Sequence, residues 1–174
     1  MVFDVRRSTV LDKKSLYILY QKVAGCNGGI SRTEREITEK YISNNLNKSL
    51  DNGMSLVVEH PENKSQIIAE IHCYKPEPKL FSHVLSDLTI VVDQEFQGKG
   101  MGQLIFRSLL DEIESSRNDI LRVELIARES NQRAIAFYQK LGFKIEGRFE
   151  SRVDCGHNQF EADIPMAWFN KNYS

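Results

Sequence analysis

The sequence contains few of the residues that staple small domains or hold metal ions. Its 174 residues include only three cysteines, at widely separated positions: Cys26, Cys73 and Cys155. An odd number of scattered cysteines gives no disulfide framework and is typical of a reducing compartment. The four histidines form no H-x-x-x-H pair and no C-x-x-C occurs, so we expect no metal centre.

An excess of one charge and a long hydrophobic run are also missing. Lys and Arg number 23 against 24 Asp and Glu, which leaves a net charge of −1. Because nucleic-acid-binding proteins usually carry a basic excess, we expect no nucleic-acid partner. The longest largely aliphatic run, residues 88–92, is far shorter than the roughly 20 residues of a membrane helix. With no basic-then-apolar leader at its start, the sequence predicts a cytoplasmic protein without a membrane partner.

The residues that are present suit one globular domain. Hydrophobic residues make up 41% of the chain and charged residues 27%. We find no internal repeat, low-complexity stretch or Ser/Gly linker that would divide it. Since single domains usually have about 100–200 residues, we expect one domain over residues 1–174.

Hydrophobic spacing and turn residues predict the order of strands and helices. We expect strands at residues 2–8, 54–60, 66–74, 88–92, 121–127, 144–149 and 161–168. We expect helices from Thr9 or Asp12 to Val23, from the capping-box sequence at 31–34 to about Asn45, and at 102–116 and 131–141. Consecutive strands without intervening helices favour a mixed sheet. The sequence therefore predicts an α+β fold with a mixed, mostly antiparallel sheet of about seven strands and four helices.

A glycine-rich turn carries the densest chemical signal. Residues 97–102 read Gln-Gly-Lys-Gly-Met-Gly and hold three of the ten glycines of the chain. Glycine allows positive φ, so such a turn can aim successive N–H groups into one concavity, and the following helix adds its positive end. This arrangement suits a pyrophosphate. The spacing fits neither a Walker loop nor a dinucleotide fingerprint, and a tight turn without a ligand is the alternative.

Asn131 and Tyr138 form a second candidate site. They are seven residues apart on a predicted helix, an advance of 700°, about 20° short of two turns, so they share a face. Ala134 between them would let a ligand approach closely. The alternative interpretation is an asparagine N-cap and a core tyrosine.

Both segments together resemble the GNAT N-acyltransferases. Residues 97–102, after a valine-rich strand and before a helix, look like the acetyl-CoA signature Q-x-x-G-x-G of that family. Residues 131–143, Asn-Gln-Arg-Ala-Ile-Ala-Phe-Tyr-Gln-Lys-Leu-Gly-Phe, are similar to its second conserved segment. The expected elements fit the whole family fold, from Val2 to Trp168. The ending is similar to bacterial amino-acid and ribosomal-protein N-acetyltransferases.

The resemblance implies an acyltransferase with acetyl-CoA as cosubstrate. Main-chain groups of Val91 and Val92 would pair with the pantetheine arm, where the strands that contain Val92 and Leu125 splay apart. Asn131 would hydrogen-bond the pantetheine, and Tyr138 would lie near the sulfur. The backbone amides that would hold the pyrophosphate belong to Gln97, Gly98, Lys99, Gly100, Met101 and Gly102.

The resemblance also implies that a free amine attacks the thioester directly in a ternary complex. A thiol with a pKa near 8.5 leaves readily once it is protonated, and Tyr138 is the candidate acid. The Val92 amide is the candidate oxyanion donor. For the base we expect Asp87, which strand alternation places on one face with Thr89 and Val91, or else a solvated strand-end carboxylate. The other candidate bases are Glu70, His72, Glu124 and His83.

The acceptor stays open at this stage. The first hypothesis is acetylation of a small amine or amino acid, and the second is acetylation of a protein N-terminus or lysine. The third is a non-catalytic CoA-binding sensor, against which the tyrosine at position 138 argues. We expect the acceptor walls to come from residues 11–50, 75–83 and 155–158. A homodimer is compatible with the sequence.

Overall fold

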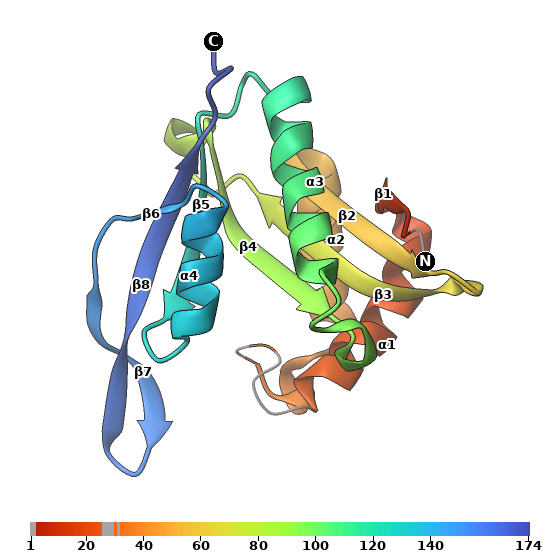
Figure 1. The fold of residues 1–174 in the computed structure, drawn as a ribbon, viewed down its shortest axis with the longest axis horizontal. Coiled ribbons are helices and arrows are strands. Elements are labelled where there is room, and N and C mark those ends of the chain that lie inside the picture. The colour runs from red at the N-terminus through yellow and green to blue at the C-terminus, as the bar shows by residue number, and fades with distance from the viewer. Residues whose placement is uncertain (1–2, 26–29, 31) are drawn as a thin grey trace. The chain divides into compact units, whose positions relative to one another are not determined.

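The structure is a computed structural model that describes residues 3–25, 30 and 32–174 (Figure 1). These residues form an eight-stranded mixed sheet and four α-helices. The strands are β1 (Val5–Arg7), β2 (Gly53–His60), β3 (Asn63–Tyr74), β4 (Val84–Val92), β5 (Arg122–Arg128), β6 (Lys144–Ile145), β7 (Phe149–Gly156) and β8 (Gln159–Phe169). The helices are α1 (Lys13–Ala24), α2 (Glu39–Asn52), α3 (Met101–Ser116) and α4 (Gln132–Lys140). The predicted α+β class is confirmed.

The strands follow the order β1-β2-β3-β4-β5-β8-β6 across the sheet, and β7 pairs with β8. The chain divides into two compact units. Unit 1 contains Met1–Lys75 and Thr89–Glu112, and unit 2 contains Pro76–Leu88 and Ile113–Ser174. The expectation of a single domain stays a prediction.

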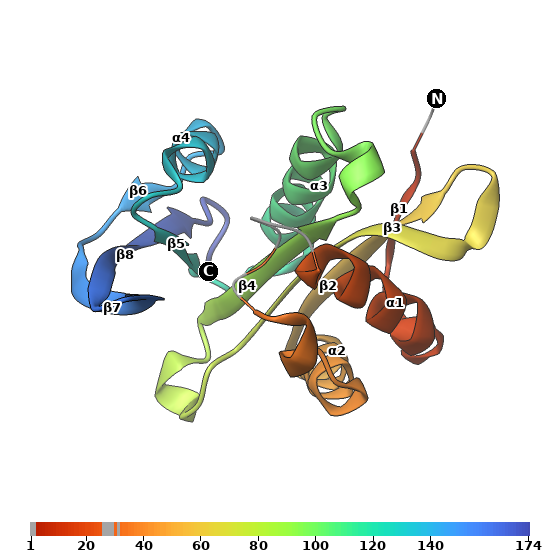
Figure 2. The ribbon, with the colours of Figure 1, turned by 90° about the horizontal axis from the view of Figure 1, so that it is seen from below.

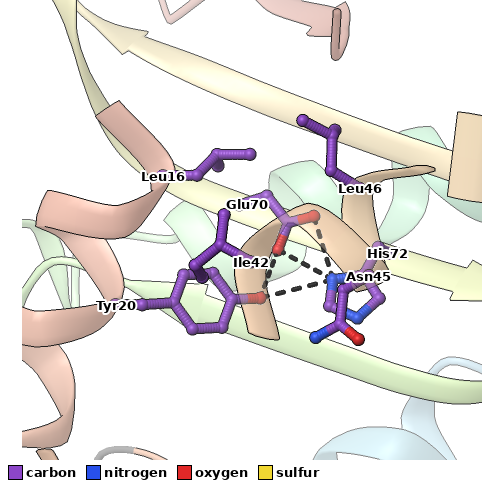
Figure 3. A pocket seen from close by; sticks show the side chains of 7 residues that line it. All are labelled: Leu16, Tyr20, Ile42, Asn45, Leu46, Glu70 and His72. Carbon is purple, nitrogen blue, oxygen red and sulfur yellow. Dashed lines mark hydrogen bonds and ion pairs between the residues drawn. The ribbon is translucent and has the colours of Figure 1, made fainter. Parts of the chain in front are cut away.

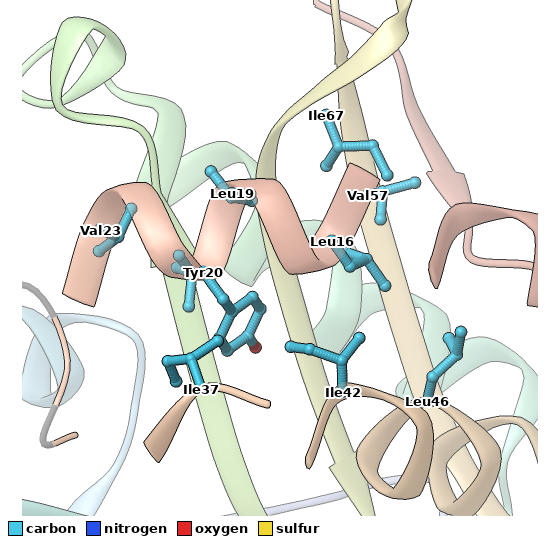
Figure 4. Packing of buried hydrophobic residues seen from close by; sticks show 10 residues of the cluster. Leu16, Leu19, Tyr20, Val23, Ile37, Ile42, Leu46, Val57 and Ile67 are labelled. Carbon is cyan, nitrogen blue, oxygen red and sulfur yellow. The ribbon is translucent and has the colours of Figure 1, made fainter. Parts of the chain in front are cut away.

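Unit 1 is built on the antiparallel strands β1, β2 and β3. Helices α1 and α2 lie on one face of these strands and α3 lies on the other (Figure 2). Apolar residues recur every three or four positions along α1, so they form one stripe that packs against α2 and the sheet. The buried cluster that results contains Leu16, Leu19, Tyr20, Val23, Ile37, Ile42, Leu46, Val57, Ile67 and Val91 (Figure 4).

The second helix begins later than the sequence predicted. Ser31 lies outside the described residues, and Thr33 instead forms a capping box with Glu36 on a short 3-10 turn, Glu34–Glu36. Helix α2 then begins at Glu39, because the Thr38 hydroxyl accepts a hydrogen bond from the Tyr41 amide at 3.1 Å. It continues to Asn52 instead of ending near residue 45. A second threonine therefore sets the start.

Unit 2 is built around β8, which pairs antiparallel with β5, β6 and β7. Strand β4 joins β5 in parallel, with Val84 opposite Arg122 and Leu85 opposite Val123. The predicted strand at 144–149 is wrong in extent: β6 is only two residues long. Strand β7 was not predicted; it turns into β8 through Gly156, His157 and Asn158, all at positive φ. That turn has no Asn-Gly or Asp-Gly pair, the usual hairpin signal.

The other predicted elements are confirmed, with small shifts at their ends. Strand β1 is shorter than residues 2–8, and residues 1–2 lie outside the described part of the chain. Strand β4 begins four residues before the predicted start at 88. In the described part of the chain, no helix is long and apolar enough to cross a membrane.

Candidate active site

The turn between β4 and α3 lies in unit 1 and is anchored by Asp93, which is 1% exposed. Its amide donates to the Ile68 carbonyl of β3 at 2.8 Å. Its carboxylate accepts from the Glu95 amide at 3.1 Å and from Lys22 Nζ at 2.8 Å. The Gln97 side chain in turn donates to the Val92 carbonyl at 3.0 Å. The turn thus leaves the strand in a fixed direction.

The glycines of this turn have the backbone that the sequence predicted. Gly98 and Gly100 have φ of 74° and 81°. A Cβ added at either position would meet no heavy atom within 4 Å, so the backbone faces open space. The first helical bond runs from the Leu104 amide to the Gly100 carbonyl at 2.9 Å. The amides of Met101, Gly102 and Gln103 precede that bond at the positive end of α3, where an anion binds favourably.

Two further predicted residues, Val91 and Val92, end strand β4 in unit 1. Val91 is buried in the α1–α2 cluster, and Val92 is half-buried. The Val92 carbonyl already accepts the bond from Gln97, and a carbonyl oxygen can accept a second one. Lys99 places its ammonium 5.4 Å from the centre of the Phe96 ring.

Asn131 caps helix α4 in unit 2. Its side-chain oxygen accepts a hydrogen bond from the Ala134 amide at 3.1 Å. The side-chain oxygen therefore acts as an N-cap, which was the alternative role that the sequence left open for Asn131. The Nδ2 group is a donor, so capping does not conflict with hydrogen bonding to a ligand.

Tyr138 is half-buried on α4, between Phe137 and Phe143, at ring-centre distances of 5.6 and 6.1 Å. Burial raises the pKa of the Tyr138 phenol above its ordinary value of 10.0. The hydroxyl therefore keeps its proton at neutral pH, which is the state a general acid needs.

Asp87 is exposed in β4 and has a φ of 53°. A left-handed residue interrupts the pleat of the strand. The strict alternation that we used to group Asp87 with Thr89 and Val91 therefore does not apply across this position. Exposure fits both roles considered for Asp87, the base and the solvated carboxylate.

The other candidate bases differ in their surroundings. Glu124 lies 2.9 Å from Arg122 Nε in unit 2. Glu70 and His72 form one buried cluster in unit 1, with His72 Nδ1 3.1 Å from both carboxylate oxygens. Tyr20, whose hydroxyl donates to Glu70 at 2.6 Å, was not predicted as part of a site. Two polar residues at alternate positions of an otherwise buried strand were the available signal.

Within the described ranges, no group of three or more His, Cys, Asp and Glu side chains could hold a metal ion. The fold and the site together are those of an α+β domain with an amide-lined turn suited to a phosphate. The sequence matches the acetyltransferase (GNAT) family over residues 17–143, and the chain belongs to that family. The resemblance stated from the two motifs is thereby confirmed.

Relatives with known names act on different acceptors. A [ribosomal protein bS18]-alanine N-acetyltransferase of Salmonella typhimurium is 41% identical over 54 residues, 31% of this chain and 35% of that protein. A spermidine N(1)-acetyltransferase of Escherichia coli is 29% identical over 91 residues, 52% of this chain and 48% of that protein. The matches thus span about a third to a half of these relatives' lengths.

A solved structure extends the likeness to the whole fold. A GNAT superfamily phosphinothricin acetyltransferase from Sinorhizobium meliloti, in complex with AcCoA, is 15% identical with a TM-score of 0.83. The alignment covers 100% of this chain and 91% of that one. At this identity the likeness establishes the fold alone.

Proposed function

We propose that the protein is an N-acetyltransferase that moves an acetyl group from acetyl-CoA to a primary amine. The glycine turn before α3 carries this proposal, because its open backbone and the adjacent helix end suit a pyrophosphate. Family membership supports it. The reaction would take place in the cytoplasm and without a metal.

Main-chain groups and one side chain would bind the cofactor. The amides of residues 97–102 would hold the pyrophosphate, and the main chain of Val91 and Val92 would pair with pantetheine. The Asn131 Nδ2 group would donate to pantetheine. Backbone amides suit this task since they are fixed before the ligand arrives.

The chemistry would be a direct transfer. The amine nitrogen attacks the thioester carbonyl, the Val92 amide stabilises the oxyanion, and the carbon–sulfur bond breaks. Tyr138 donates its proton to the departing thiolate, and Asp87 accepts the proton of the amine. The raised pKa of Tyr138 keeps the phenol protonated, which is compatible with the first assignment. The exposed position of Asp87 is compatible with the second.

The acceptor that we propose is a small amine or an amino acid. The spermidine acetyltransferase among the relatives favours a small amine. The bS18-alanine acetyltransferase favours a protein N-terminus as the second candidate. Release of thiol from acetyl-CoA with a panel of amines, amino acids and peptides distinguishes the two. A sensor without catalysis would bind acetyl-CoA and release no thiol with any acceptor.

A pair of matched glycine variants tests the cofactor site. Gly100 and Gly156 have φ of 81° and 80°, and a Cβ at either would face open space. Valine at each position should therefore cost a similar amount of stability, about 1–2 kcal/mol. We expect Gly100→Val to weaken acetyl-CoA binding steeply, because the side chain obstructs the approach to the backbone. Gly156→Val, in the hairpin of unit 2, should leave binding unchanged.

The measurement is the thermal shift with acetyl-CoA. Ligand at 100 times its Kd should add about 2.7 kcal/mol of stability to the parent and to Gly156→Val. Equal shifts for all three proteins would contradict the assignment of the glycine turn before α3 as the pyrophosphate site. A shift with ATP or NAD instead of acetyl-CoA would contradict the proposed function.

A further inference from the structure

The turn that would hold the pyrophosphate contains more acidic than basic residues. Residues 93–102 include Asp93 and Glu95 but a single lysine, Lys99, so their formal charges sum to −1. A pyrophosphate is an anion, and like charges repel. The backbone of the turn therefore suits this ligand, whereas the charges of its side chains do not. A cation from another element would resolve the conflict.

The acidic residues of the turn are held in place. The Asp93 carboxylate caps the short 3-10 turn that follows it, through the Glu95 amide at 3.1 Å, and the Asp93 carbonyl accepts from the Phe96 amide at 2.9 Å. The Phe96 ring packs edge-on against the rings of Phe3 and His60, with 6.0 and 5.5 Å between the ring centres. Because these contacts fix the backbone from Asp93 to Phe96, the carboxylates stay within the turn.

Lys22 of α1 brings the missing positive charge. Its Nζ lies 2.8 Å from Asp93 Oδ2 and 2.8 Å from Glu95 Oε1. The other Asp93 oxygen accepts from an amide, and both contacts favour the ionised carboxylate. Hydrogen bonds to Asp93 and to Glu95 raise the pKa of Lys22 above its ordinary value of 10.5, so the ammonium stays charged at neutral pH. Addition of Lys22 to residues 93–102 brings their formal charge from −1 to zero.

The buried face of α1 fixes the helix that carries Lys22. Leu19 and Val23 lie in the cluster that α1 forms with α2 and the sheet (Figure 4). Between them, the Tyr20 hydroxyl donates to Glu70 of β3 at 2.6 Å (Figure 3). A lysine that extends from a fixed helix and is held by two carboxylates is in place before a ligand arrives, which favours preorganised binding.

We propose that Lys22 is a positioning residue of the cofactor turn, which neutralises Asp93 and Glu95 and thereby allows the turn to bind a pyrophosphate. Lys22 acts through these carboxylates and does not touch the ligand. The identity of the anion as part of acetyl-CoA rests on the proposed acetyltransferase function, whereas the charge balance applies to any pyrophosphate. Affinity should therefore depend on Lys22 only while its partners are charged.

A second ion pair of α1 provides a matched control. The side chains of Lys13 and Lys22 are each 42% exposed, and their partners Glu39 and Glu95 are 75% and 74% exposed. Lys13→Met and Lys22→Met thus remove the same charge from the same helix. We expect Lys22→Met to raise the Kd of acetyl-CoA about tenfold at low ionic strength. Lys13→Met should leave it unchanged. Both are measured by isothermal titration calorimetry of the full chain.

Two further readouts separate neutralisation from a merely structural contact. Asp93→Asn removes the charge and keeps an oxygen that can cap the turn, so the double variant with Lys22→Met should regain most of the lost affinity. The effect of Lys22→Met should also shrink to about twofold when NaCl rises from about 20 mM to about 500 mM, because the Debye length falls from about 20 Å to about 4 Å. A lost packing contact would give neither result.

Glu95→Gln tests the same charge balance if Lys22→Met does not fold. The Glu95 side chain is 74% exposed, and its backbone amide still donates to Asp93. Loss of this negative charge should lower the Kd of acetyl-CoA about threefold at low ionic strength, and Glu39→Gln should not change it. Equal Kd values for the parent and Lys22→Met, no rescue by Asp93→Asn, or no tighter binding in Glu95→Gln would overturn the proposal.

Titration with inorganic pyrophosphate on the same samples separates this proposal from the proposed function. Pyrophosphate binding that Lys22→Met weakens, without acetyl-CoA binding in the parent, refutes the proposed function alone. Acetyl-CoA binding that is equal in the parent and in Lys22→Met refutes the role of Lys22 alone. Absence of binding of both anions to the parent refutes both.

Discussion

Carboxylates of the two units are held in opposite ways. In unit 1, Glu70 is 2% exposed and is bonded by two hydroxyls and an imidazole. In unit 2, the Glu129 side chain is 37% exposed, and Arg148 holds it through Nε at 2.5 Å and Nη2 at 2.7 Å. Arginine pairs with the carboxylate where water already screens charge, while the buried carboxyl group has hydroxyls and an imidazole as its partners. The comparison separates a surface ion pair from a buried hydrogen-bonded cluster.

The largest effect expected from this comparison is on stability. Glu70→Ala would remove the buried acceptor that Tyr20, Ser55 and His72 share, and we expect a loss of about 3–5 kcal/mol in the free energy of unfolding. Glu129→Ala removes a screened surface pair, so we expect no measurable loss. Urea denaturation of both variants measures the difference in the free energy of unfolding. The comparison requires equal m-values for the two variants. Similar small losses for both variants would show that the Glu70 cluster is open to water.

Variants of two tyrosines, Tyr138 and Tyr20, extend the comparison of the two units to catalysis. Burial raises the pKa of both phenols, and the Glu70 charge raises that of Tyr20 further. Tyr138→Phe should lower kcat about 10²-fold, the low end of general acid catalysis, because a thiolate already leaves readily. The thermal shift with acetyl-CoA should be unchanged. Tyr20→Phe should instead lower stability by about 1–3 kcal/mol, because Glu70 loses a donor.

The kinetic test needs an accepted amine and conditions in which chemistry limits the rate. An unchanged kcat in Tyr138→Phe would remove the hydroxyl from the mechanism and leave Tyr138 as a packing residue. Measurement of kcat and KM for Tyr138→Phe and Tyr20→Phe distinguishes a loss of catalysis from a loss of structure.

Local signals in the sequence predicted much of the fold. Glycines at 98 and 100 define the turn before α3 because few other residues adopt positive φ at no cost, and the structure confirms both angles. The apolar stripe of α1 predicts its buried face. In contrast, the start of α2 was predicted wrongly because two threonines, Thr33 and Thr38, act as caps, and only Thr38 continues into a helix. Strand β7 was missed because its exposed residues show little alternation.

The candidate site was less accessible to sequence reasoning. Asn131 and Tyr138 could be grouped since helix geometry fixes a spacing of seven residues. Tyr20, Ser55, Glu70 and His72 come from α1, β2 and β3, so only the strand pairing and helix packing bring them together. Alternation across Asp87 failed because a left-handed residue in a strand leaves no mark in the hydrophobic pattern.

The smallest expected effect concerns Asp12 in unit 1. This carboxylate is buried, as Glu70 is, and is also paired with an arginine, as Glu129 is. Burial by itself would raise the pKa of Asp12, but hydrogen bonds from Arg6 and from the Thr9 amide outweigh it and lower the pKa below its ordinary value of 3.8. A carboxyl group whose pKa is lower in the folded state adds stability above its unfolded pKa, and this stability is lost as the pH falls through the folded value.

We therefore expect Asp12→Asn to cost about 1 kcal/mol at pH 7. The gap between parent and variant should shrink as the pH falls below about 4. Thermal unfolding of both proteins from pH 7 to pH 3 measures this gap, and subtraction of the variant removes the contribution of other carboxylates, such as Glu59 and Glu129. A gap that stays constant over this range would mean that Asp12 acts as a neutral cap and that its charge contributes nothing to the stability of unit 1.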